Sequence, residues 1–145
     1  YGDHAKTFRV GKVDEQKEEL IKITKDCLDA GIEQAVPGNT IGDIGFSIQT
    51  IAENNGMSVV RDLVGHGIGR KLHEEPQVPN FGIKGTGVTI EEGLCLAIEP
   101  MINLGSADVF TKDDNWTVCS ADGMPSAHFE HSIAVIDNKV KVLTK

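Results

Sequence analysis

The sequence lacks the features that mark several common protein classes. It has only three cysteines, Cys27, Cys95 and Cys119, which are widely spaced and form no C-x-x-C pair. This odd, scattered set indicates neither a disulfide framework nor a thiolate zinc site, and favours reduced thiols in the cytoplasm. No apolar run approaches the roughly 20 residues that span a bilayer, and the first residues do not resemble a signal peptide. We therefore expect no membrane-spanning segment.

Basic clusters are also absent. The formal net charge is −8 at pH 7, and no stripe of Lys and Arg could release counterions from phosphates. We therefore expect no direct nucleic-acid site. The chain has 145 residues, of which 39% are hydrophobic. This length and composition predict one domain, 1–145, with a single sizeable core.

The hydrophobic pattern predicts two helices, followed by short strands. Between residues 14 and 36, apolar residues recur at helical spacing with charges between them, which predicts an amphipathic helix ending at Pro37. Thr40 and Asp43 are predicted to cap a second helix that ends at Gly56. Helices followed by an antiparallel sheet indicate the α+β class. The β-rich segments are 58–61, 88–90, 94–99, 109–111, 117–119, 127–136 and 139–143.

Two of these predicted strands each carry one carboxylate. Alternation along 94–99 places Glu99 on the same face as Cys95 and Ala97, and alternation along 129–136 likewise places Glu130 among small residues. A buried carboxylate is costly unless it is paired or bound to a metal. For either glutamate alone, an ion pair or a solvent-exposed strand end is the alternative explanation.

Histidines strengthen the interpretation as a metal site. His66 stands between glycines in the segment 64–69, where glycine permits close approach to a ligand or φ values barred to other residues. His73 follows shortly after, whereas His128 and His131 are interpreted as structural. Carboxylates with one imidazole suit Mn, Fe, Co or Zn, and two bridged ions can hold a hydroxide at neutral pH. Hydrolysis is therefore the predicted reaction class.

Other chemistries fit the sequence less well. The glycines around His66 lack the pattern G-x-x-x-x-G-K-[ST] and are followed by Pro76 and Pro79 rather than by a helix, which disfavours nucleotide binding. No G-x-S-x-G occurs, and no cysteine stands beside a histidine in sequence. A serine or cysteine nucleophile is therefore weakly supported.

Four segments in order carry a family resemblance: G-H-G-I-G-R at 65–70, H-E-E-P-Q-V-P-N at 73–80, A-I-E-P-M at 97–101 and F-E-H-S at 129–132. Together they resemble the type I methionine aminopeptidases, and the resemblance covers nearly the whole chain. It implies the α+β pita-bread fold, of which this chain would be the C-terminal half, with two helices packed on a curved antiparallel sheet. It also implies a cytoplasmic enzyme that removes the initiator methionine by means of a metal-bound hydroxide.

The resemblance further implies a ligand set. His66 and Glu99 would bind one metal ion, while Asp3 and Glu130 would bridge to a second, so that the cofactors would be two divalent ions (Co, Mn, Fe or Zn). The family has a further aspartate on the strand before Asp3. Because the chain begins with Tyr1 in what looks like the middle of a strand, we expect it to hold one ion, against His66.

The remaining implications concern catalysis and partners. Glu99 would manage the proton of the attacking water, and His73 would contact the scissile amide or stabilise the tetrahedral intermediate. Trp116 would lie near the methionine pocket, and Ser126 would bind a structural monovalent cation. The substrates would be the N-termini of nascent chains, which is compatible with association with the ribosome. The full-length protein would be a monomer. We expect weak or no activity from these 145 residues alone.

Two alternatives stay open at this point. Prolidases and creatinases share the histidine and glutamate framework, so an X-Pro dipeptidase or creatinase-like hydrolase is one of them. The other is a non-catalytic binding module on the same scaffold. The intact set of candidate ligands speaks against it, because a pure binding role gives no reason to keep these residue types at matching positions.

Overall fold

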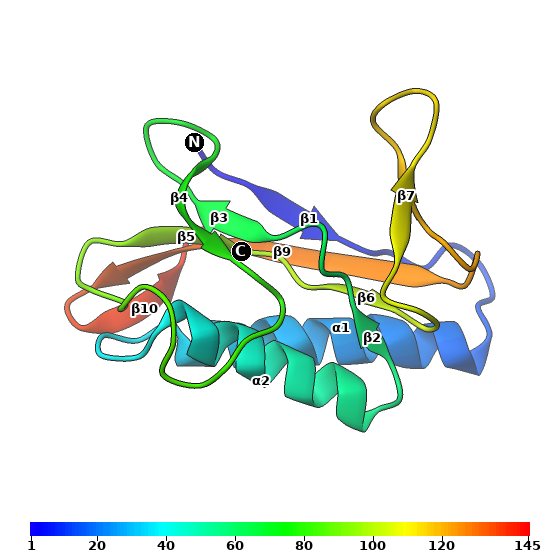
Figure 1. Cartoon of the computed structure of the whole chain (residues 1–145), viewed down its shortest axis with the longest axis horizontal. Coiled ribbons are helices and arrows are strands. Elements are labelled where there is room, and N and C mark those ends of the chain that lie inside the picture. Colours follow the sequence, from blue (N-terminus) through cyan, green and yellow to red (C-terminus); the bar gives the residue numbers. More distant parts are fainter.

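Two helices cover one face of an antiparallel sheet in the computed structural model, which describes residues 1–145 (Figure 1). Helix α1 spans Glu15–Gln34 and helix α2 spans Ile41–Asn54. This arrangement confirms the predicted α+β class. The strands are β1 (His4–Lys6), β2 (Ser58–Val59), β3 (Gly65–Gly67), β4 (Glu74–Val78), β5 (Cys95–Ile98), β6 (Met101–Asn103), β7 (Val109–Thr111), β8 (Val118–Ser120), β9 (Ser126–Ile136) and β10 (Lys139–Val142).

Local sequence determines where both helices begin. Asp14 precedes α1, and its carboxylate accepts a hydrogen bond from the Lys17 backbone N–H at 3.0 Å. Thr40 precedes α2, and its backbone N–H donates to the Asp43 carboxylate at 2.8 Å. This reciprocal bond satisfies a backbone donor at the helix start. The predicted cap of the second helix is therefore confirmed.

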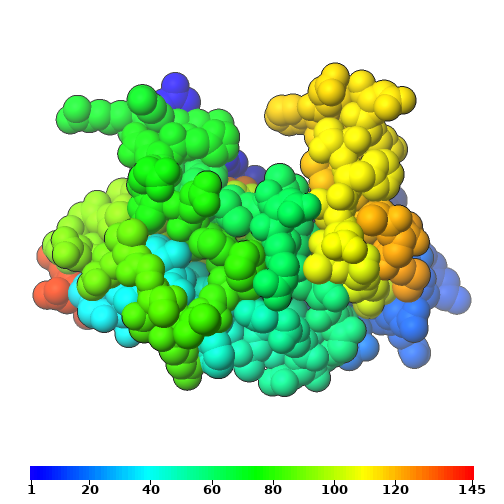
Figure 2. Space-filling view, viewed as in Figure 1, coloured from blue at the N-terminus to red at the C-terminus, as the bar shows by residue number.

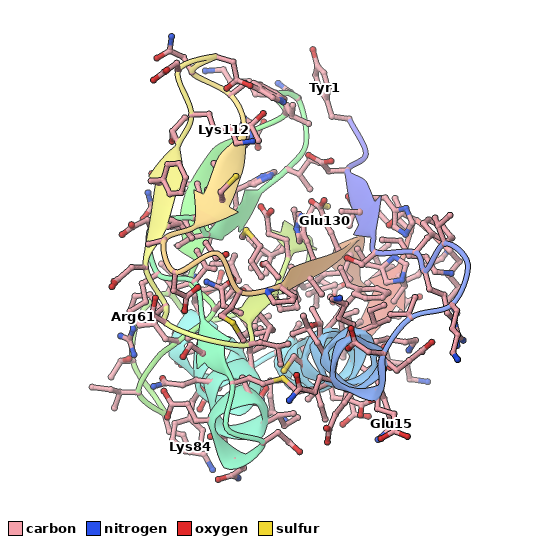
Figure 3. The ribbon with its side chains drawn as sticks, turned by 90° about the vertical axis from the view of Figure 1, so that its right-hand side faces the viewer. Tyr1, Glu15, Arg61, Lys84, Lys112 and Glu130 are labelled. Atoms are coloured by element: carbon pink, nitrogen blue, oxygen red, sulfur yellow. The ribbon has the colours of Figure 1, made fainter.

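Strand β9 is the centre of the sheet. The main strand order is β2-β6-β9-β5-β3-β4, and β1 and β10 also pair with β9. Phe129, Ile133 and Val135 of β9 belong to a core of 21 buried hydrophobic residues that joins the sheet to the helices. The predicted alternation along β9 is thus confirmed, and it leaves Glu130 on the face away from the helices (Figure 3).

A separate hairpin, β7–β8, stands away from the sheet (Figure 1). On the other side of the open face, the connection between β3 and β4 also projects outward (Figure 1). Neither helix combines the length and apolar character needed to cross a bilayer.

Several strands differ from the predicted ones. Residues 88–90 form no strand, because their pairing is limited to an isolated bridge between Thr40 and Thr89. Strands β3, β4 and β6 were not predicted. The first of these is only three residues long, and β4 contains Pro76, which removes a donor from the ladder.

Candidate metal centre

Sheet register gathers the candidate ligands on the face that the helices leave open. His66 of β3 pairs with Ala97 of β5, and Ala97 pairs in turn with Ser132 of β9. Directly paired residues share a face, so one imidazole stands in a row with two small side chains. The Ser132 hydroxyl accepts from the Asp3 N–H at 2.8 Å and donates to the Asp3 carbonyl at 2.9 Å. Asp3 is thereby fixed at the end of the same row.

The two glutamates lie in the next row. Glu99 directly follows β5, whose last residue is paired with His131, so Glu99 lies beside Glu130. Oε1 of Glu99 lies 3.6 Å from His66 Nε2, and Oδ2 of Asp3 lies 3.9 Å from the same nitrogen. Ligand atoms of Asp3, His66 and Glu130 all lie within 4.8 Å of one another. The structure therefore brings together all the predicted ligands.

The glycines beside His66 serve close packing of strands. A Cβ added to Gly65 would lie 2.4 Å from the Ala97 carbonyl oxygen, and one added to Gly67 would lie 2.1 Å from that of Glu75. Neither glycine has a positive φ, so unusual backbone angles do not explain them. The glycines permit a close approach, as predicted, but the group that approaches is the backbone of a neighbouring strand rather than a ligand.

Ring orientation prepares His66 to accept a cation. Nδ1 of His66 lies 2.9 Å from the Gly67 carbonyl oxygen. In the tautomer that donates Nδ1–H to this carbonyl, Nε2 keeps its lone pair and faces the carboxylates. Metal-binding histidines commonly use the second ring nitrogen in this way.

Glu130 gives the most direct test of whether a cation fits. Its side chain is 4% exposed, and Oε1 has no hydrogen-bond partner. Burial, together with the negative charges of Glu99 and Asp3, raises the pKa of Glu130 to about 8. An unpartnered buried carboxylate beside two others is unfavourable without a balancing positive charge. Carboxylates with one imidazole suit divalent ions such as Mn, Fe, Co or Zn, so the residues fit such a group.

One side of the cluster opens onto a groove of about 1910 Å³. Figure 2 shows this groove as a hollow between two projections, the segment near residue 70 and the β7–β8 hairpin. His66 and Glu99 line the floor, so the candidate metal centre is accessible from solvent.

The other predicted site residues also line this groove. The ring centroid of His73 lies 4.3 Å from that of His66, in an edge-on arrangement. Trp116 belongs to the turn of the hairpin and is 87% exposed. Ser126 begins β9, and its hydroxyl donates to the Ile102 carbonyl at 3.2 Å. His73 is therefore next to the cluster, whereas Trp116 stands on the hairpin wall.

His128, interpreted from the sequence as structural, faces the cluster. Its Nε2 lies 3.2 Å from Glu99 Oε2, and ligand atoms of Glu99, His128 and Glu130 lie within 4.8 Å of one another. The sequence indicates this position, because His128 stands two residues before Glu130 in a strand and therefore lies on the same face. His131 lies on the other face and stacks on His4, with ring centroids 5.0 Å apart.

Asn80 was also missed. Its side chain is fully buried, and Nδ2 donates to the Glu99 backbone carbonyl at 3.3 Å. It thus holds the backbone just after β5 in place. Asn80 ends the segment 73–80 that carries part of the family resemblance, but nothing in that segment indicates a contact with Glu99.

Carboxylates and an imidazole at the floor of an accessible groove form a donor set suited to metal-assisted hydrolysis. The sequence matches metallopeptidase family M24 over residues 1–137, and the chain belongs to that family.

Similar proteins include methionine aminopeptidases. That of Clostridium perfringens is 52% identical over 144 residues, which are 99% of this chain and 58% of that protein. The crystal structure of methionine aminopeptidase from Thermotoga maritima is 47% identical with a TM-score of 0.97, and the match covers 100% of this chain and 58% of that one. The predicted pita-bread fold is therefore confirmed. This chain spans about 58% of the length of these relatives.

A more distant likeness extends to a prolidase. The enzyme from Pyrococcus horikoshii is 24% identical with a TM-score of 0.77, over 99% of this chain and 36% of that one. At this identity the likeness concerns the fold alone.

Proposed function

We propose that the protein containing this chain is a methionine aminopeptidase, which hydrolyses the first peptide bond of chains that begin with methionine and a small second residue. The observation that carries the proposal is the cluster of Asp3, His66, Glu99 and Glu130, of which His66 and Glu99 line the groove. Relatives named methionine aminopeptidase at 52% and 47% identity support it. Because the chain spans about 58% of their length, the proposal concerns the whole protein.

The cluster would hold divalent cations. His66 and Glu99 would bind one ion, and the carboxylates of Asp3 and Glu130 would face both this ion and a second. Co, Mn, Fe and Zn all suit these donors. When bound, the ions supply Lewis acidity toward a water molecule and the peptide carbonyl.

Two residues would handle protons and developing charge. Glu99 opens onto the groove and would accept the proton of the attacking water as a general base. His73 stands at the groove wall beside His66 and would donate a hydrogen bond to the oxygen of the tetrahedral intermediate.

The groove would bind the substrate's N-terminal residues. Trp116 and Phe110 of the hairpin are exposed apolar side chains on one wall. Aromatic rings make favourable contacts with a methionine thioether, so this wall suits the first residue of the substrate. We place the protein in the cytoplasm as a monomer that works on nascent chains near the ribosome.

Release of methionine from the peptide Met-Ala-Ser by the whole protein, supplied with Mn²⁺ or Co²⁺, tests this function. Loss of the general base in Glu99→Gln should lower kcat by about 10²-fold or more. His131→Gln is the matched control, because His131 lies on the other face of β9 and should leave turnover unchanged.

Other outcomes would contradict the proposal. Preferential cleavage of an X-Pro dipeptide would identify a prolidase-like hydrolase, and absence of both activities from the metal-loaded protein would identify a binding module. For the 145 residues alone we expect turnover far below that of the whole protein; comparable turnover would refute that expectation.

A further inference from the structure

The two carboxylate oxygens of Glu99 face two different imidazoles. Oε1 lies 3.6 Å from His66 Nε2, on the side of the candidate metal centre. Oε2 lies 3.2 Å from His128 Nε2. A carboxylate that binds a cation through one oxygen needs a second partner to hold its other oxygen in place.

We propose that His128 is a positioning residue, which donates a hydrogen bond to Oε2 of Glu99 and so directs Oε1 toward the ion held by His66. This inference rests on the proposed metal-dependent function and assigns a role to a residue outside the predicted ligand set. His128 would act on the cation only through Glu99.

The backbone of His128 is fixed from both sides. On one side, the Thr7 hydroxyl donates to the His128 carbonyl at 2.9 Å and accepts from the His128 N–H at 2.9 Å. On the other side, His128 pairs with Met101 of β6. The ring therefore extends from a rigid point in the sheet, as a positioning group requires.

Glu99 is held at a second point as well. Its backbone carbonyl accepts from Asn80 Nδ2 at 3.3 Å. Because the main chain is anchored, the remaining freedom of Glu99 lies in its side-chain torsions. His128 Nε2 is the group that faces Oε2 of this side chain.

His128 and Glu99 are close but do not form a hydrogen bond in the structure. The two atoms are 3.2 Å apart, and Nε2 of His128 is buried without a hydrogen-bond partner. Hydrogen bonds in sites without ligand are often poorly aligned and tighten when the ligand binds. A buried ring N–H with no other acceptor is available for this bond.

Manganese affinity of matched variants tests the proposal. His128→Leu removes the donor and should weaken Mn²⁺ binding, measured by titration calorimetry, by about 10- to 100-fold. His128→Gln keeps an N–H donor and should bind Mn²⁺ nearly as the wild type does. His131→Gln, on the opposite face of the same strand, should have unchanged affinity.

The visible spectrum of bound Co²⁺ supplies a readout of ligand geometry. It should change in His128→Leu and return to the wild-type form in His128→Gln. Thermal unfolding of each variant checks that it folds, and His128→Ala replaces the leucine variant if that one does not.

The possible failures are distinct. Wild-type affinity in the folded variant, leucine or alanine, would overturn the proposal. Equally weak binding by His128→Gln and His128→Leu would also overturn it, because that pattern marks a direct ligand. If the wild-type protein binds no Mn²⁺ or Co²⁺, the proposed metal-dependent function fails first.

Discussion

Replacing Glu130 by glutamine should remove a loss of stability that the metal-free protein suffers as the pH rises to about 8. Glutamine has nearly the same shape as glutamate but cannot ionise. Glu130 is 4% exposed, and its Oε1 has no hydrogen-bond partner. Burial, and then the charges of Glu99 and Asp3, raise the pKa of Glu130 from its ordinary value of 4.5 to about 8.

The direction of the pH effect follows from proton binding. Between pH 4.5 and about 8, folded Glu130 retains a proton that the unfolded chain has released. Because the folded state binds more protons in this interval, the free energy of unfolding falls as pH rises through it and levels off above it. At about 1.4 kcal/mol per pH unit, the loss from this group amounts to about 5 kcal/mol at most.

Urea unfolding in EDTA, followed by circular dichroism at about pH 6 and about pH 9, measures this effect. The wild type should have a lower free energy of unfolding at the higher pH. Glu130→Gln should not show the loss that ionisation of Glu130 causes, and at the higher pH it should be more stable than the wild type. Adding Mn²⁺ at the higher pH should restore the wild type, because the ion binds the ionised carboxylate. Glu33→Gln, at an exposed position of α1, is the control and should behave as the wild type. An equal alkaline loss in Glu130→Gln would refute the reasoning.

Two further substitutions test how the site is supported. Gly67→Ala places a Cβ 2.1 Å from the Glu75 carbonyl oxygen, so β3 and β4 must separate; we expect a loss of about 1–3 kcal/mol in urea unfolding. Gly69→Ala meets only a flexible carboxylate, at 3.2 Å, and should cost clearly less. Asn80→Ala removes the bond to the Glu99 carbonyl and should cost about 1 kcal/mol and weaken Mn²⁺ binding in calorimetry; unchanged affinity would show that Asn80 does not support Glu99.

Much of the fold could be predicted because its longest elements have clear periodicity. The helices follow from apolar spacing and, for α2, from Thr40 as its cap, and β9 follows from strict alternation. The strands that were missed owe their pairing to distant partners. Gly65–Gly67 becomes a strand only because Ala97 and Val78 flank it, and this is a tertiary effect that short segments do not encode.

The candidate site was predictable as a set of residues but not as an arrangement. Alternation placed Glu99 and Glu130 on faces with small side chains, and the register of β5 with β9 puts these faces side by side. The same alternation places His128 on the face of Glu130, although no feature of the sequence separates its role from that of His131. The hairpin that carries Trp116 shapes the groove by its position in space, which no local pattern indicates.

The most direct test of the metal centre is an anomalous difference map from a crystal of the protein grown with Mn²⁺. We predict a peak within bonding distance of His66 Nε2 and of carboxylate oxygens from Asp3, Glu99 and Glu130. Absence of a peak there, or a peak only at another position, would contradict the assignment of these residues as metal ligands.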